Sequence, residues 1–144
     1  MTCEIRRLTI DDYDDLIRVW ADAGLPYRPH GRDQKDNIAV QMQRPDTAFL
    51  GLFENDRLVA VALATFDGRK GWINRVAVEP EYRRRGYAGE LIRACESFLK
   101  QRGAEIIAAL IEDYNLPSMA LIQKHGYLYV EDVLYFSKRK SEET

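Results

Sequence analysis

The segment from residue 76 to residue 89 holds the densest group of residues that could bind an anion. Three consecutive arginines, Arg83 to Arg85, stand directly before Gly86, between a strand-like apolar segment and a helical pattern that starts at Ala88. The first turn of a helix presents unpaired N–H groups and a partial positive charge, and arginines add donors for phosphate oxygens. The segment is therefore predicted to bind a phosphate-bearing ligand.

Glycine and small residues strengthen this interpretation. Gly86 can adopt a positive φ and lets a ligand come close to the backbone, while Ala88 and Gly89 keep the first helical turn open. The segment is not a P-loop, because no Gly-Lys-Ser/Thr follows, and it lacks the glycine and the later acidic residue of a Rossmann fingerprint. A solvated basic loop with a turn glycine is the alternative that these residues leave open.

Hydrophobic patterning predicts the elements that must position this loop. The expected strands are 3–8, 47–53, 58–66, 71–78, 105–111, 127–130 and 132–137, and the expected helices are 11–22, 33–44, 88–101 and 115–124. The order βααβββαβαββ predicts an α/β fold with a mixed sheet. Short polar turns make the strands between 47 and 78 antiparallel neighbours, and the helix at 88–101 makes 71–78 and 105–111 a parallel pair.

Composition favours one soluble domain and excludes several function classes. The chain has 144 residues, 46% hydrophobic and 31% charged, which predicts a single domain over 1–144 with an ordered core at about 3–137 and a frayed tail at 138–144. Cys3 and Cys95 are far apart and lack metal-ligand spacing, so we expect no disulfide framework, no metal and a reducing cytoplasm. No run of about 18 apolar residues and no signal-peptide core is present. The net charge of −2 argues against a membrane partner and against a nucleic-acid binder that uses the triple arginine.

Two motifs, in register with this order of elements, resemble the Gcn5-related N-acetyltransferase (GNAT) family. The pyrophosphate motif of that family, Gln/Arg-x-x-Gly-x-Gly/Ala, is matched by Arg83-x-x-Gly86-x-Ala88. The segment before it, with valines at 76 and 78 and proline at 80, is also typical of the family. A second motif is matched by Asn115, Ser118, Leu121, Lys124 and Gly126-Tyr127. The order of elements agrees from about residue 3 to residue 137.

The resemblance implies a GNAT-like, mostly antiparallel sheet whose central parallel pair is splayed around acetyl-coenzyme A. It implies direct attack of a primary amine on the thioester, with a backbone N–H of strand 71–78 stabilising the oxyanion. The expected acceptor is a small-molecule or peptide amine, and the chain is expected to be a monomer or a homodimer. The implied cofactor-binding residues are Val76, Ala77, Val78, Arg83, Arg84, Arg85, Gly86, Tyr87, Ala88, Gly89, Asn115, Ser118 and Lys124.

The residues that would carry protons depart from the family pattern. Many members place a tyrosine after the motif leucine and a glutamate late in the second parallel strand, where this chain has Ile122 and Leu110. Glu112 and Tyr127 rank slightly above their neighbours Asp113, Tyr114 and Tyr129 as candidates to replace them. A catalytically weak or inactive coenzyme A-binding module is the alternative, which turnover assays against amines would separate from an enzyme. The loop at 25–32 corresponds to the acceptor side of the family, although a solvated loop is the better explanation of its composition.

Overall fold

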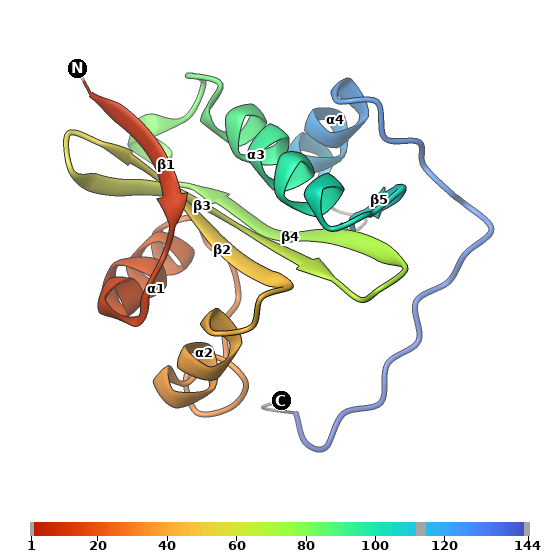
Figure 1. The fold of residues 1–144 in the computed structure, drawn as a ribbon, viewed down its shortest axis with the longest axis horizontal. Coiled ribbons are helices and arrows are strands. Elements are labelled where there is room, and N and C mark those ends of the chain that lie inside the picture. Colours follow the sequence, from red (N-terminus) through yellow and green to blue (C-terminus); the bar gives the residue numbers. More distant parts are fainter. Residues whose placement is uncertain (1, 112–114, 143–144) are drawn as a thin grey trace.

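The computed structural model describes residues 2–111 and 115–142 of the chain, and these form a five-stranded sheet with helices on both faces (Figure 1). The strands are β1 (Cys3–Arg7), β2 (Thr47–Glu54), β3 (Arg57–Phe66), β4 (Lys70–Val78) and β5 (Ile106–Ala108), in that spatial order. The pairs from β1 to β4 are antiparallel, and β5 runs parallel to β4. The predicted mixed sheet with one parallel pair is confirmed.

The helices divide between the two faces of this sheet. They are the single-turn η1 (Ile10–Asp12), α1 (Tyr13–Asp22), α2 (Lys35–Met42), the single-turn η2 (Pro80–Tyr82), α3 (Tyr87–Gln101) and α4 (Leu116–Lys124). Figure 1 shows α1 and α2 on one face, with α3 and α4 on the other. The four predicted long helices are present, with ends within a few residues of those that the pattern indicates.

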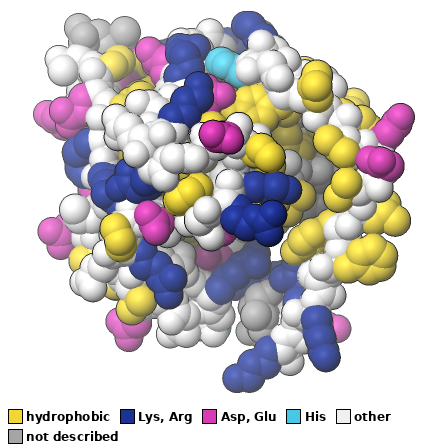
Figure 2. Space-filling model, turned by 45° about the vertical axis from the view of Figure 1, so that its right-hand side comes forward, with side chains coloured by type: hydrophobic (Ala, Val, Ile, Leu, Met, Phe, Trp, Pro, Cys, Tyr) yellow, Lys and Arg dark blue, Asp and Glu magenta, His cyan; other side chains and the backbone are white. Residues whose placement is uncertain are grey.

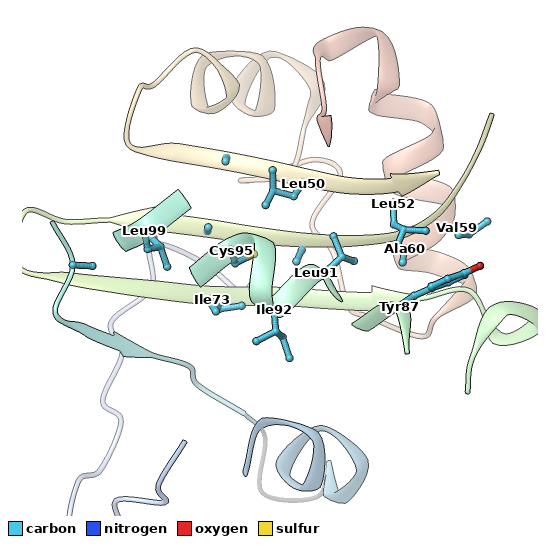
Figure 3. Packing of buried hydrophobic residues seen from close by; sticks show 14 residues of the cluster. Leu50, Leu52, Val59, Ala60, Ile73, Tyr87, Leu91, Ile92, Cys95 and Leu99 are labelled. Carbon is cyan, nitrogen blue, oxygen red and sulfur yellow. The ribbon is translucent and has the colours of Figure 1, made fainter. Parts of the chain in front are cut away.

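The core on the α3 face explains why this helix stays fixed against the sheet. Leu91, Cys95 and Leu99 are fully buried, one helical turn apart, and they pack against alternating residues of β2 and β3 such as Leu50 and Ala60 (Figure 3). This is the inner stripe that the periodicity predicts. Burial raises the pKa of the Cys95 thiol to about 12, so this sulfur is a core atom rather than a nucleophile.

The opposite face is closed by α1 and by the segment that follows it. Leu16 and Trp20 are buried there against Phe49 and Val61 of the sheet. β3 therefore faces a core on both sides, as its continuous apolar run predicts for a central strand. The segment between α1 and α2 is held by side chains: the Tyr13 hydroxyl donates to the backbone oxygen of Asp33 at 2.7 Å.

The two strands predicted near the C-terminus are a wrong prediction. The described residues from 127 to 142 contain no strand, and Leu128, Tyr129 and Phe136 expose 88%, 75% and 85% of their surface. Figure 1 shows this segment leaving α4 and curving away from the sheet. Its tyrosines, leucines and valines favour extended backbone, but a strand also needs a hydrogen-bonding partner from elsewhere in the chain. Whether such a partner is available depends on how the whole chain packs and not on the segment itself.

None of the helices in residues 2–111 and 115–142 is long and apolar enough to cross a membrane.

Candidate active site

A bulge in β4 opens the sheet between its two parallel strands. Leu63 of β3 pairs with Asn74 and Val61 pairs with Ala77, so two residues of β4 stand opposite one of β3. Arg75 lies at the bulge and adopts a left-handed backbone with φ of 57°. β4 and β5 pair only between residues 70–72 and 106–108, which is shorter than the predicted strand at 105–111. Beyond this short ladder the two strands run apart.

The space between the diverging strands is a pocket of about 340 Å³. Ile73, Asn74 and Val76 line it from β4, and residues 109–111 line it from the chain that follows β5. Asn115, Ser118, Leu121 and Ile122 of the α4 region close one side, and the segment after α1 closes the other. Figure 2 shows hydrophobic and basic side chains meeting around a hollowed area beside the C-terminal segment. The opening that the resemblance implies is therefore a feature of the fold.

The loop before α3 has the backbone geometry of an anion site. Gly86 precedes the first helical residue with φ of 79°, the positive value expected from its glycine. Apart from its chain neighbours, no described atom lies within 4 Å of the place that a Cβ would take at Gly86. Arg84 also has a positive φ, of 65°. The N–H groups of the first turn of α3 are thus presented toward open space.

The three arginines of this loop have different surroundings. The Arg85 guanidinium donates to both carboxylate oxygens of Glu54, at 2.9 and 3.1 Å. Arg83 donates from Nε to the backbone oxygen of Val78 at 3.2 Å. The Arg84 side chain is exposed and has no acceptor within hydrogen-bond distance among the described residues. Only Arg84 therefore has a side chain that is unengaged in the described structure.

Two residues in the first turn of α3, Tyr87 and Gly89, are fixed by packing. Tyr87 is buried and its hydroxyl donates to Glu54 at 2.6 Å, so its side chain anchors the helix to β2 while its N–H stays at the helix start. A Cβ on Gly89 would lie 3.0 Å from Nε2 of His125, which places the end of α4 over the first turn of α3. Glycine at position 89 therefore allows α3 and α4 to come close together.

The second motif lies on α4 and reaches the pocket with part of its residues. The Asn115 side-chain oxygen accepts a hydrogen bond from the N–H of Ser118 at 3.2 Å and so caps the helix. Both residues line the pocket, whereas Lys124 is exposed at the far end of α4 and does not. In β4, Val76 lines the pocket and Ala77 is buried on the α1 face. The N–H and C=O groups of this strand, rather than the Ala77 side chain, are what a ligand can reach.

The structure describes one of the two candidate proton carriers. Glu112 lies outside the described residues. The Tyr127 hydroxyl donates to a carboxylate oxygen of Glu96 on α3 at 2.7 Å, and burial together with this bond raises its pKa. Tyr127 packs against the core and does not line the pocket. Leu110 and Ile122, which occupy the usual family positions, do line it.

Sequence reasoning missed the arginines that line the other side of the pocket. Arg28 and Arg32 come from the segment after α1, and Arg75 comes from the β4 bulge. One signal was available: a charged residue in the middle of an apolar strand, as Arg75 is, needs a reason to be there. No group of three or more metal-ligating side chains occurs within the described residues.

Comparisons with known proteins give the class of protein. A family model described as the acetyltransferase (GNAT) family matches residues 9–127. The chain therefore belongs to the GNAT family of acetyltransferases, as its two motifs predict. An acetyltransferase of Yersinia pestis (strain Pestoides F) is 28% identical over 136 residues, which are 94% of each chain.

Solved structures show the same fold. The PaiA N-acetyltransferase from Thermoplasma acidophilum, in complex with coenzyme A, superposes with a TM-score of 0.77 at 21% identity, over 87% of this chain and 89% of that one. AAC(6′)-Iy in complex with the bisubstrate analogue CoA-S-monomethyl-acetylneamine gives a TM-score of 0.81 at 19% identity, over 96% and 99% of the two chains. At these identities the likeness is one of fold.

Proposed function

We propose that this protein transfers the acetyl group of acetyl-coenzyme A to a primary amine in the cytoplasm. The observation that carries the proposal is the pocket beside β4 and β5, together with the Gly86 turn at the start of α3, the helix that follows β4. One site can then hold an extended thioester arm and a pyrophosphate. Membership of the acetyltransferase family supports the same reaction.

The residues present fit coenzyme A. The N–H groups of residues 84–88 face open space at a helix N-terminus and would hold the pyrophosphate, with Arg84 adding a charged donor. Unpaired backbone groups of β4 around Val76 and Val78 would bind the pantetheine arm like an added strand. Asn115 and Ser118 would contact the arm from α4. When bound, the coenzyme supplies the acetyl group as a thioester.

The chain must orient the acceptor and move two protons. In the reaction a bond forms between the acceptor nitrogen and the acetyl carbon while the carbon–sulfur bond breaks. The amine has an ordinary pKa near 10.4, so it must give up a proton before attack and a second one after it, and the leaving thiolate takes one up. A backbone N–H at the β4 bulge would stabilise negative charge on the acetyl oxygen.

Leu110 and Ile122 cannot carry these protons, so the candidates are Glu112 as base and Tyr127 as acid. For Tyr127 to act, its hydroxyl must leave the Glu96 carboxylate that now accepts its hydrogen bond. If Tyr127 is the acid, Tyr127→Phe lowers kcat by about 10²–10⁴-fold and leaves the Kd of coenzyme A unchanged. A kcat that stays within about twofold of the parent's removes Tyr127 from the mechanism.

The test of the proposed function is an acceptor screen with acetyl-coenzyme A that reads free coenzyme A thiol. Thermal unfolding is followed alongside, because a ligand specific for the native state raises Tm. We expect a higher Tm with millimolar acetyl-coenzyme A and thiol release with at least one amine. A raised Tm without release above the hydrolysis background would favour the coenzyme A-binding module instead, which the apolar Leu110 and Ile122 also fit. No shift in Tm would contradict both.

A further inference from the structure

We call residues 83–88, which would hold the pyrophosphate, the coenzyme loop. Arginines are concentrated on the side of the pocket that lies away from this loop. Arg28 and Arg32 line it from the segment after α1, Arg75 from the β4 bulge and Arg139 from the C-terminal segment. Among the described residues that line the pocket, none carries a carboxylate. This side of the pocket therefore has a strong positive potential, with the low-dielectric wall of Leu25 and Ile73 beside it.

Of these arginines, Arg75 is the one whose position in the fold costs the most free energy. Its guanidinium lies 4.1 Å from the centre of the Trp20 ring, and its Nη2 atom is buried without a hydrogen-bond partner in the described structure. Burial lowers its pKa, while Asp33 opposes that change. A buried N–H without an acceptor costs free energy, more so on a charged group, and the left-handed φ at Arg75 adds strain. Two such costs at one pocket residue point to a ligand that satisfies it.

Among the described residues that line the pocket, no carboxylate neutralises Arg28, Arg32 and Arg75. Asp33 is buried behind the segment, where it accepts the backbone N–H of Arg28 at 2.7 Å and lies 4.0 Å from Nε of Arg32. The guanidinium of Arg28 is exposed and has no acceptor among the described residues. Among the described residues, one carboxylate thus faces these three arginines. Arg18, by contrast, is paired with the buried Glu79.

These arginines are separate from the coenzyme loop. Residues 83–88, all of them described, contribute nothing to the lining of this pocket, and they follow β4 whereas Arg75 lies within it. A coenzyme held by the helix N-terminus would therefore bring its thioester end, and not its phosphates, toward Arg75. The group that meets the arginines must then belong to the second substrate.

Resting on the proposed function, we propose that the acceptor is a small amine that also carries a carboxylate or phosphate group, and that Arg28, Arg32 and Arg75 bind this anionic group. A planar guanidinium matches both oxyanions with paired hydrogen bonds. Binding the anion here fixes the amine nitrogen toward the β4 bulge, where the acetyl group is expected. The arginines are specificity-determining residues that disfavour polycationic amines.

Matched amine pairs test this assignment on the full chain. Leucine is compared with leucinamide, 4-aminobutyrate with butylamine, and O-phosphoethanolamine with ethanolamine, all with acetyl-coenzyme A. Spermidine and neamine serve as cationic competitors. We expect at least one anionic member to exceed its partner in kcat/KM by about tenfold or more, the effect of one charge-assisted bond. A larger kcat/KM ratio for the leucine or 4-aminobutyrate pair indicates a carboxylate site, and a larger ratio for the O-phosphoethanolamine pair indicates a phosphate site.

Variants then locate the site. Arg28→Gln and Arg32→Gln change exposed side chains, so folding is expected to persist, and each should reduce the anionic-to-neutral preference ratio by about tenfold. Arg75→Gln should reduce it as well, and Arg75→Lys should restore part of it. Arg69→Gln, in the exposed β3–β4 turn, is the matched control and should leave the ratio unchanged. Calorimetric binding of N-acetyl-leucine and N-acetyl-leucinamide in the presence of coenzyme A gives the same preference without turnover.

The outcomes separate this proposal from the proposed function. Higher kcat/KM for spermidine or neamine than for every anionic amine would overturn the anionic acceptor and leave the transferase intact. If Arg28→Gln and Arg32→Gln weaken coenzyme A binding as much as they reduce the anionic-to-neutral preference, the arginines belong to the coenzyme site. That result would also overturn the anionic acceptor. Arginine-dependent binding of N-acetyl-leucine without turnover of any amine would support the anion site while the transferase proposal failed.

Discussion

The two ends of the candidate site present hydrogen-bond donors in different ways, although each contains an arginine with a left-handed backbone. In the loop before α3, Arg84 has φ of 65° and stands beside Gly86, so the chain turns its N–H groups outward. In the β4 bulge, Arg75 has φ of 57° and is one of the residues that line the pocket. The first end offers main-chain donors and the second offers side chains. The strained backbone serves the positioning of donors in both cases.

This difference decides how each end can be damaged. Main-chain donors cannot be removed by truncating a side chain, but they can be covered by adding one. Side-chain donors can be removed singly, and the loss should follow their charge. The comparison also shows that an arginine's role depends on its partner: Arg85 is bound to the buried Glu54, whereas Arg75 has an unpartnered atom.

Adding a side chain at the main-chain end should have the largest effect. We expect Gly86→Val to weaken coenzyme A binding by more than about 100-fold, since the new Cβ enters the open space before the helix and a β-branched residue opposes the positive φ. Calorimetric titration measures the Kd, and circular dichroism follows folding.

Gly103→Val is the matched control for this change. Gly103 also has a positive φ, of 97°, with open space around its Cβ position, but it lies at the other end of α3. It should lose similar stability and keep coenzyme A affinity. Parent-like affinity in a folded Gly86→Val protein would show that the pyrophosphate binds elsewhere.

Breaking a buried arginine pair should affect stability instead of binding preference. Glu79 is 4% exposed and accepts from Arg18 and Arg57, so Glu79→Ala removes the buried carboxylate and leaves Arg18 with the more exposed Asp15. We expect the free energy of unfolding to fall by about 3 kcal/mol, as for other buried pairs. Urea unfolding gives this value, and Glu81→Ala, an exposed acidic neighbour, is the control. An unchanged urea midpoint would mean that pairing with a buried carboxylate does not distinguish Arg18 from the arginines of the pocket.

Removing the charge at the main-chain end should have a smaller effect than blocking it. Arg84→Ala keeps the backbone N–H groups and loses one exposed charged donor, which contributes roughly a tenfold change in the Kd of coenzyme A. The salt dependence of binding should also decrease, because one ion pair is lost. If Arg84→Ala weakens binding more than Gly86→Val does, side chains rather than main-chain groups dominate this end.

The two ends also differ in how far the sequence predicts them. The geometry of the loop before α3 was predictable because it is local: Gly86 and the helix that follows are adjacent in the chain, and the positive φ of Gly86 follows from its residue type. The arginine side depends on α1, the segment after it and a bulge in β4, which meet only in the folded chain. The last two predicted strands failed for the same reason, because pairing is not local.

The smallest effect is expected for Arg85, although its position in the loop resembles that of Arg84. Both oxygens of Glu54 accept from its guanidinium, and Tyr87 donates to the same carboxylate. Releasing Arg85 to a phosphate would therefore leave the buried Glu54 carboxylate without its arginine. We therefore expect Arg85→Ala to change the Kd of coenzyme A by less than about fivefold while lowering Tm. Hydrogen bonds to Cys3 and to Glu54 raise the pKa of Tyr87, so its hydroxyl should stay protonated and keep donating to Glu54 between about pH 7 and pH 9. Glu54→Gln tests the reverse case, because it removes the carboxylate that binds Arg85 and keeps the arginine itself. A loss of affinity in Arg85→Ala as large as in Arg84→Ala would show that both arginines reach the phosphates, and that the Glu54 pair opens when the coenzyme binds.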